Sequence, residues 1–289
     1  MKPRDLAMLV GLAAMWGASY LFIRVASPVF GPAGLMAARV LIASALLWIV
    51  LRARGGRLRL AAMWRADLAL GAVNAAVPFL LIAIATLSIT ASLAAVLNAT
   101  TPVFSAIASA IWLRKRPGAA VLLGLPVGIA GVAIVVGAGP LPITPALLAG
   151  AACSLVAAAC YGVGSVFARQ RFAGVAPAEL SFRQLFAAGV LLLPATAVAP
   201  PRGVPDAGAV LALLVLAVIC TAVAYLIYFT LITRIGAVGT TSVTFLIPVF
   251  GIVWGALFLQ EPLSVAQLPG ILLIFLSMAL VSGLIRKPD

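Results

Sequence analysis

The chain has 289 residues, of which 65% are apolar and only 9% are charged, and it carries no histidine. Soluble domains carry roughly a quarter charged residues, so this composition excludes a protein surrounded by water on all sides. Without histidine, the chain can form neither a Ser/His/Asp triad nor a zinc site with histidine ligands. The formal net charge is +13. Its three cysteines lie inside apolar runs without CxxC spacing, which indicates packing residues; they are Cys153, Cys160 and Cys220.

Long apolar runs predict an all-α integral membrane protein. Only helical bundles and closed barrels satisfy every backbone polar group in lipid, and barrel strands alternate over about 10 residues. A membrane-spanning helix needs roughly 20 apolar residues, and the runs here reach about that length without alternation. We predict ten transmembrane helices over Leu6–Ala26, Ala33–Leu51, Asp67–Leu87, Ser92–Leu113, Val121–Gly137, Leu147–Phe167, Glu179–Ala199, Gly208–Leu231, Ala237–Leu259 and Gln267–Ile285.

The basic residues indicate the orientation of the bundle. With the amino terminus inside, fifteen of the nineteen Lys and Arg fall at the inner side. Cytoplasmic segments are enriched in Lys and Arg, so both termini are predicted to be cytoplasmic. The basic residues are spread over every inner loop, where contact with anionic lipid explains them. We therefore expect lipid and a small-molecule substrate as partners, and no nucleic acid.

The two halves of the sequence repeat each other. A shift of 145 residues places Trp16-Gly17 on Tyr161-Gly162, and a shift of 146 places Pro102-Val103-Phe104 on Pro248-Val249-Phe250. The first register also pairs Phe22 with Phe167, Arg24 with Arg169 and Pro32 with Pro177. We predict two five-helix repeats, residues 1–140 and 141–289. Because each repeat has an odd number of spans, the second is inverted relative to the first, as in many secondary transporters.

These motifs resemble the drug/metabolite transporter superfamily, and most closely its ten-helix EamA members. The resemblance covers residues 6–285 and is carried by Trp16-Gly17, Arg24, Arg39, Thr101-Pro102-Val103-Phe104, Pro248-Val249-Phe250 and Glu261-Pro262. It implies a bacterial-type inner-membrane carrier of small metabolites, with amino-acid exporters prominent, including exporters of aromatic amino acids. One departure is Arg114-Lys115-Arg116-Pro117, where the family commonly carries a glutamate before the turn.

Prolines inside three predicted helices indicate where a substrate could bind. A proline removes one helical hydrogen bond and frees the carbonyl four residues earlier. The prolines and the residues whose carbonyls they free are Pro102 with Asn98, Pro248 with Thr244, and Pro78 with Asn74. Such groups are tolerated only against protein or a wet cavity. We expect them, with Thr101 beside Pro102, to line a substrate cavity; the alternative is a kink capped by neighbouring hydroxyl groups.

Aromatic residues with a polar tip gather at the same depth. Trp16 and Tyr20 lie on one face of the first span, Tyr161 matches Trp16 in the repeat, and Tyr225 lies in the eighth span. Two interpretations are open. The residues form either ordinary helix packing or the wall of a cavity that accepts an amphipathic or aromatic solute.

Two arginines fall within predicted spans. Arg39 lies about six residues from the outer end of its span, and it either attracts a substrate carboxylate in the outer vestibule or snorkels to anchor loops or lipid headgroups. For Arg183 we expect snorkelling at the inner end, with Glu179 one helical turn away as a partner. All six carboxylates lie at span ends or in loops. The chain thus lacks the deep carboxylate of a proton-coupled drug exporter, and we expect facilitated export or coupling through other groups.

Together these features predict an exporter of neutral or aromatic amino acids that works by alternating access, and no enzyme, metal site or cofactor. The alternatives are a carrier of another metabolite class or drug, and a channel or scaffold. The glycines Gly124, Gly128 and Gly131 allow close packing of helices. We assign that packing to the inside of a monomer, with a dimer as the alternative.

Overall fold

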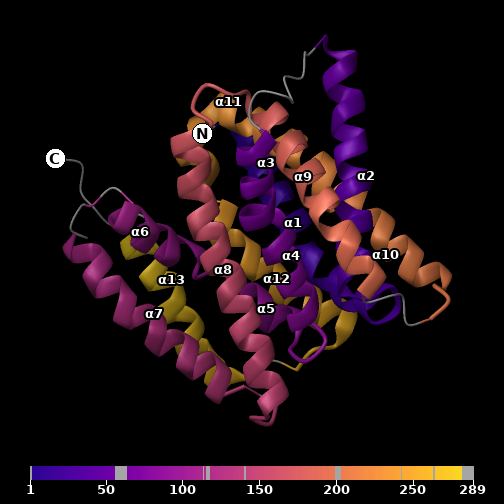
Figure 1. Ribbon diagram of the computed structural model, residues 1–289. Helices are drawn as coiled ribbons and strands as arrows, with labels where there is room; N and C mark the ends of the chain where they lie inside the picture. Colours follow the sequence, from indigo (N-terminus) through magenta and orange to yellow (C-terminus); the bar gives the residue numbers. More distant parts are fainter. Residues whose placement is uncertain are drawn as a thin grey trace.

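A computed structural model of the chain describes residues 2–55, 64–112, 114, 118–139, 141–198, 203–241, 243–262 and 264–281. Over these ranges the chain is a bundle of helices without a strand (Figure 1). In the described part, eight helices are long and apolar enough to cross a membrane, and two shorter apolar helices follow them. The predicted all-α architecture of ten membrane helices is confirmed.

The first half contains five spans. Their helices are α1 (Pro3–Phe30), α2 (Pro32–Ala53), α3 (Trp64–Gly71) with η1 (Ala72–Ala76) and α4 (Val77–Ala85), α5 (Ala91–Asn98) with α6 (Thr101–Trp112), and α7 (Ala119–Gly137). The fourth span, predicted as one helix, is broken between α5 and α6. Its predicted end at Leu113 lies outside the described residues.

The second half repeats this order. Its helices are α8 (Pro145–Arg171), α9 (Pro177–Val198), α10 (Ala207–Ala217) with η2 (Val218–Val223) and α11 (Ala224–Thr241), α12 (Val243–Leu259), and η3 (Val265–Gln267) with α13 (Leu268–Val281). The predicted span ends at Ala199 and Ile285 lie outside the described residues. Gly236 has φ 76° within α11, so the eighth span ends there and the ninth begins.

Local sequence explains where several helices begin. Pro32, Pro145 and Pro177 occupy first helical positions, where the missing N–H costs no hydrogen bond. Gly31, with φ 70°, makes the tight turn between α1 and α2. The hydroxyl of Thr144 accepts a hydrogen bond from Leu147 N at 3.1 Å and so caps α8.

The two halves interlock through equivalent helix crossings. α1 of the first half packs against α12 of the second, and α8 of the second packs against α6 of the first. A Cβ on Gly17 would lie 2.9 Å from the backbone of Gly251, and a Cβ on Gly162 would lie 2.7 Å from the backbone of Ser105. The two glycines, matched by the 145-residue shift, therefore make the same close approach in both halves. α2 and α9, another matched pair, pack against each other.

The fifth and tenth spans form a separate pair at one side of the bundle (Figure 1). A Cβ on Gly131 would lie 2.8 Å from the carbonyl oxygen of Gly270, and the hydroxyl of Ser277 donates to the carbonyl of Gly124 at 2.6 Å. Gly128 also faces Ser277. The expectation that these glycines serve packing inside the bundle is confirmed.

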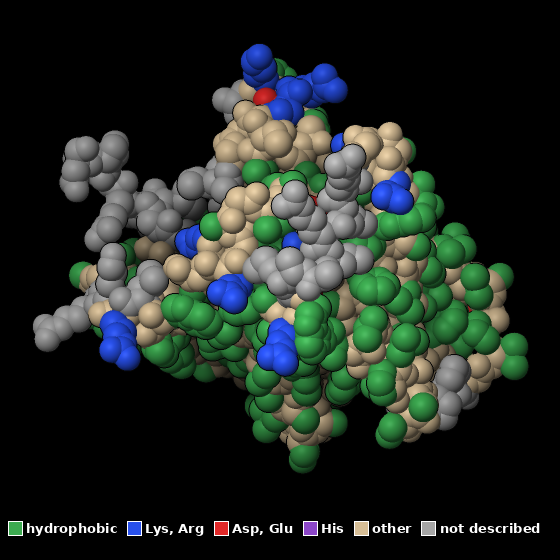
Figure 2. Space-filling model, turned by 45° about the horizontal axis from the view of Figure 1, so that its top comes forward, with side chains coloured by type: hydrophobic (Ala, Val, Ile, Leu, Met, Phe, Trp, Pro, Cys, Tyr) green, Lys and Arg blue, Asp and Glu red, His purple; other side chains and the backbone are tan. Residues whose placement is uncertain are grey.

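The two ends of the bundle differ in charge. Figure 2 shows Lys and Arg side chains around one end, above flanks that are mostly hydrophobic. We call this the basic end; its exposed residues include Lys2, Arg4, Arg52, Arg54, Arg65, Arg114, Arg169 and Arg171. The opposite end carries Glu261 and, within the described residues, Arg24 as its single Lys or Arg.

Candidate substrate site

A π-helical turn interrupts the third span of each half. In η1 the amide of Val77 donates to the carbonyl of Ala72, and after η2 the amide of Ala224 donates to the carbonyl of Ile219, each five residues earlier. The 146-residue shift places η1 on η2. π turns often occur at functional sites. The turn in η1 also precedes Pro78, which has no N–H to donate. Asn74 and Thr221 lie in the two π turns, near the middle of their spans.

Arg39 is the central charged residue. Its side chain is 5% exposed, and its Nε donates to Thr221 Oγ1 at 2.9 Å. The guanidinium lies over the ring of Phe79, 4.1 Å from its centroid. Thr221 is midway along the eighth span, so of the two alternatives for Arg39, snorkelling is wrong. A charge at this depth costs about 2.5 to 3.5 kcal/mol on insertion scales.

Gln184 occupies the position in the second half that Arg39 occupies in the first. Its Oε1 accepts from Asn74 Nδ2 at 2.8 Å, and its Nε2 donates to the hydroxyl of Tyr225 at 3.3 Å. Thus Arg39 and Gln184 each contact the third span of their own half and the π turn of the other half. The two residues therefore make equivalent contacts in the two halves, although Arg39 is charged and Gln184 is neutral.

All four tyrosines of the chain gather around these groups. Trp16 packs against Tyr225 and Tyr228, with ring centroids 6.1 and 5.5 Å apart, and Phe79 packs against Tyr161 at 6.3 Å. Tyr20, Tyr161 and Tyr225 lie within electrostatic range of Arg39. We call these side chains, Trp16, Tyr20, Arg39, Asn74, Phe79, Tyr161, Gln184, Thr221, Tyr225 and Tyr228, the central cluster.

The second set of predicted residues lies at kinks. Asn98 and Thr101 flank the break between α5 and α6, and the hydroxyl of Thr101 donates to the carbonyl of Asn98 at 2.7 Å. The prediction of an unpaired Asn98 carbonyl is therefore wrong, and the capped kink is what forms. The side-chain Nδ2 of Asn98 is buried without a partner in the described part of the chain. Thr244 precedes Pro248, which is buried in α12.

Ion pairs fix the basic end. Nε and Nη2 of Arg183, which is 3% exposed, donate to the two carboxylate oxygens of Asp67 at 2.9 and 3.0 Å. The predicted contact with Glu179 is confirmed at 3.5 Å, but snorkelling is wrong because Asp67, on α3, holds the guanidinium inside. Arg234 pairs with Asp5 at 2.5 Å.

A different junction fixes the opposite end. The carboxylate of Glu261 accepts from the amides of Ala91 and Ser92 at 2.6 and 2.9 Å and from the hydroxyl of Ser92 at 2.6 Å. Arg24, in the last two turns of α1, lies 3.6 Å from the same carboxylate and donates to the carbonyl of Thr86 at 2.7 Å. We call this group the Glu261 junction; it joins α1, the start of α5 and the turn after α12.

The fourth and ninth spans meet at the opposite end. α5 packs against α12, where a Cβ on Gly251 would lie 2.5 Å from the Cβ of Ala95. α6, nearer the basic end, packs on α8 and makes no comparable contact with α11 or α12 among the described residues. Ile111 and Trp112 of α6 are 74% and 50% exposed.

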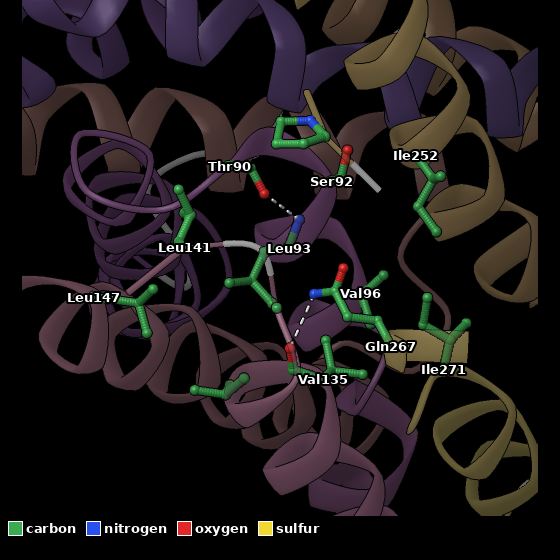
Figure 3. Close-up of a pocket in the computed structure, with 13 residues that line it drawn as sticks. Thr90, Ser92, Leu93, Val96, Val135, Leu141, Leu147, Ile252, Gln267 and Ile271 are labelled. Atoms are coloured by element: carbon green, nitrogen blue, oxygen red, sulfur yellow. Dashed lines mark hydrogen bonds between the residues drawn. The ribbon is translucent and has the colours of Figure 1, made fainter. Parts of the chain in front are cut away.

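A small cleft lies beside the Glu261 junction and not at the central cluster. Figure 3 shows its lining, which includes Leu93, Val96 and Ile252, with Gln267 Nε2 donating to the carbonyl of Val135 at 2.9 Å. The lining is mainly aliphatic. The expectation of a hydrated hollow at the central cluster stays a prediction.

The two interlocked five-helix halves and the polar centre between them define a membrane transporter built from inverted repeats. The model of the EamA-like transporter family matches residues 5–137 and again residues 148–283. The chain belongs to the EamA-like transporter family.

Similar proteins agree with this assignment. The chain is 30% identical over 286 residues to a protein of Bacillus subtilis (strain 168) named uncharacterized transporter YvbV, covering 97% of this chain and 92% of that protein. It is 27% identical over 181 residues to YoaV of the same organism, also named a transporter, covering 62% of each chain. A solved crystal structure described only as that of a protein has a TM-score of 0.69 at 20% identity, covers 99% of both chains and supports the fold.

Proposed function

We propose that this membrane transporter exports small amphipathic metabolites, with neutral or aromatic amino acids as the expected substrates. The observation that carries the proposal is Arg39, which is buried where the two halves meet and forms none of the four ion pairs in the described part of the chain. Its guanidinium lies over the ring of Phe79, and three tyrosines lie within electrostatic range of it. Charged groups inside membrane bundles commonly mark substrate pathways.

Alternating access is the proposed mechanism. The Glu261 junction closes the opposite end, whereas α6 stands apart from the ninth span toward the basic end. This difference supports an arrangement that is open toward the basic end. Rocking of the two repeats would then close that end and open the other.

The proposed site is cytoplasm-facing in this arrangement, since Lys and Arg favour the cytoplasmic side of a bacterial inner membrane. Five of the six carboxylates lie in the described residues, and each is engaged at an end of the bundle. Asp289 lies outside them. This distribution supports facilitated export without a carboxylate that carries protons through the site.

Counterflow in liposomes tests the proposal. Purified protein is reconstituted with unlabelled phenylalanine inside, and uptake of labelled phenylalanine, a nucleoside and a sugar is measured. A carrier gives saturable uptake that the internal substrate accelerates. Flux that rises linearly with concentration and carries single-channel currents would instead establish a channel. A folded protein without flux for any of the three would indicate a scaffold and contradict the proposal.

A further inference from the structure

Arg39 has polar and aromatic neighbours but no counter-charge among the described residues. Its Nε is used by Thr221, and its Nη1 lies 3.9 Å from the sulfur of Met36. The described carboxylates pair with other groups at the two ends of the bundle. A buried cation that is neutralised by no fixed group favours the binding of an anion.

The hydroxyl groups near Arg39 can donate to such an anion. Tyr225 accepts a hydrogen bond from Gln184, so its own hydroxyl proton remains to be donated elsewhere. Tyr20 and Tyr161 lie within electrostatic range of the same guanidinium. Phenol groups together with a guanidinium provide the donors that a carboxylate requires.

The central cluster offers much less to an ammonium group. Gln184 Oε1, an amide oxygen in the cluster, already accepts from Asn74. An ammonium group gains most from a carboxylate, and the central cluster contains no carboxylate. The rings of Trp16, Tyr225 and Tyr228 instead provide an apolar wall for the rest of a substrate.

We infer that the site recognises its substrate through a carboxylate at Arg39 and an aromatic or bulky apolar body, and that an ammonium group adds little. The inference rests on the proposed function and specifies its substrate class. Aromatic monocarboxylates without an amino group are therefore substrates alongside the corresponding amino acids. Aromatic amines that lack a carboxylate are excluded.

Three matched ligands test the inference on the unmodified protein. They are 3-phenylpropanoate, which has only the carboxylate, phenylalanine, which has both charges, and 2-phenylethylamine, which has only the ammonium group. Thermal stabilisation in detergent and inhibition of phenylalanine counterflow are measured for each. We expect the first two ligands to act within a few-fold of each other, and the amine to show no effect at tenfold higher concentration.

Variants of Arg39 then test whether binding of the carboxylate ligands depends on this side chain. Arg39→Gln should raise the half-maximal concentration for both carboxylates at least tenfold, whereas Arg39→Lys, which keeps the charge, should recover part of the affinity. Arg65→Gln, at an exposed position of the basic end, is the control and should bind as the original protein does. Equal losses of affinity in Arg39→Lys and Arg39→Gln would overturn the inference.

The outcomes separate this inference from the proposed function. Binding or counterflow of 2-phenylethylamine in preference to 3-phenylpropanoate would overturn the inference and leave a carrier of cations. Stabilisation by both carboxylates without any counterflow would support the inference and contradict the proposed transport. Thermal stabilisation by chloride alone, with no further effect of the organic acids, would also overturn the inference.

Discussion

Arg39 and Gln184 are equivalent residues of the two repeats, and each holds a polar side chain on the π turn of the other half. Arg39 Nε lies 2.9 Å from Thr221 Oγ1, and Gln184 Oε1 lies 2.8 Å from Asn74 Nδ2. Each is also in contact with the third span of its own half, through Phe79 and Tyr225. The interface between the two halves thus contains two equivalent polar contacts, Arg39 with Thr221 and Gln184 with Asn74. Only the first includes a charged side chain.

Gln184→Leu tests the neutral contact between Gln184 and Asn74. The change leaves the amide of Asn74 without its partner, and a buried unpaired polar group costs about 1 to 3 kcal/mol. We expect a lower melting temperature and a several-fold loss of counterflow, since Tyr225 also loses its donor. Gln170→Leu, at an exposed position of α8, is the matched control. Equal melting temperatures and fluxes for the two variants would show that the contact is unimportant.

Asp67→Asn tests the buried ion pair at the basic end. Removing one partner of a buried pair costs about 3 to 5 kcal/mol because the remaining charge is left uncompensated. Glu179→Gln should cost less than about 1 kcal/mol, since that carboxylate is partly exposed and 3.5 Å from Arg183. Chemical unfolding in mild detergent measures both. A larger loss for Glu179→Gln would contradict the assignment of Asp67 as the main partner.

Gly17→Ala tests the crossing between α1 and α12. A Cβ there would lie 2.9 Å from the backbone of Gly251, which cannot move without separating the helices. We expect a loss of several degrees in melting temperature, and a similar loss for the equivalent change Gly162→Ala. Gly11→Ala adds the same methyl group to α1 where nothing lies within 4 Å, so it should be neutral or slightly stabilising. Indifference of the melting temperature to Gly17→Ala would refute the close crossing.

Glu261→Gln tests the closure of the opposite end. Hydrogen bonds to a charged group contribute about 1.5 to 3 kcal/mol, so the variant should open that end more often. The readout is the labelling rate of a cysteine introduced at Leu93, 6% exposed, in a protein without its native cysteines. A membrane-impermeant maleimide should label it several-fold faster in Glu261→Gln.

A cysteine at Val204, which is 95% exposed, controls for general changes in reactivity and should label at one rate in both backgrounds. An unchanged rate at Leu93 would mean that the Glu261 junction does not hold the end closed.

Lys115→Glu tests why the two ends differ. Lys115 lies outside the described residues, but the 146-residue shift pairs it with Glu261, and the 145-residue shift pairs Arg169 with Arg24. A glutamate at residue 115 supplies the carboxylate that the basic end lacks at this position. We expect it to favour closure of that end, and so to raise labelling at Leu93→Cys. Lys115→Gln removes the charge without adding a carboxylate, and an equal increase in that control would contradict this explanation.

The sequence was sufficient to predict the ten spans, because each is a long apolar run whose burial in lipid depends little on its neighbours. The repeat register also identified equivalent positions, and applying it to Arg39 would have indicated Gln184. The π turns were missed, since hydropathy does not distinguish a turn closed five residues apart from an ordinary one. Phe79 and Thr221 were missed because both lie within apolar runs, where hydropathy does not mark a residue as a neighbour of Arg39.

Counting residues from the end of a helix did not predict where the arginine side chains lie. Reaching an end of the bundle was one of two alternatives for Arg39 and the expectation for Arg183, but their partners, Thr221 and Asp67, belong to spans distant in sequence. An arginine side chain is expected to snorkel only where no partner inside the bundle is available. At Asn98 the hydroxyl of Thr101 was close enough in sequence to anticipate the cap that forms.

The position of a bound substrate tests the central claim most directly. Crystals grown with 4-bromophenylalanine would locate the bromine by its anomalous signal. We predict a single strong peak within the central cluster, beside Trp16 and Tyr225, with the carboxylate at Arg39. A peak found only in the cleft lined by Leu93 and Gln267, or on the lipid-facing surface, would contradict the account.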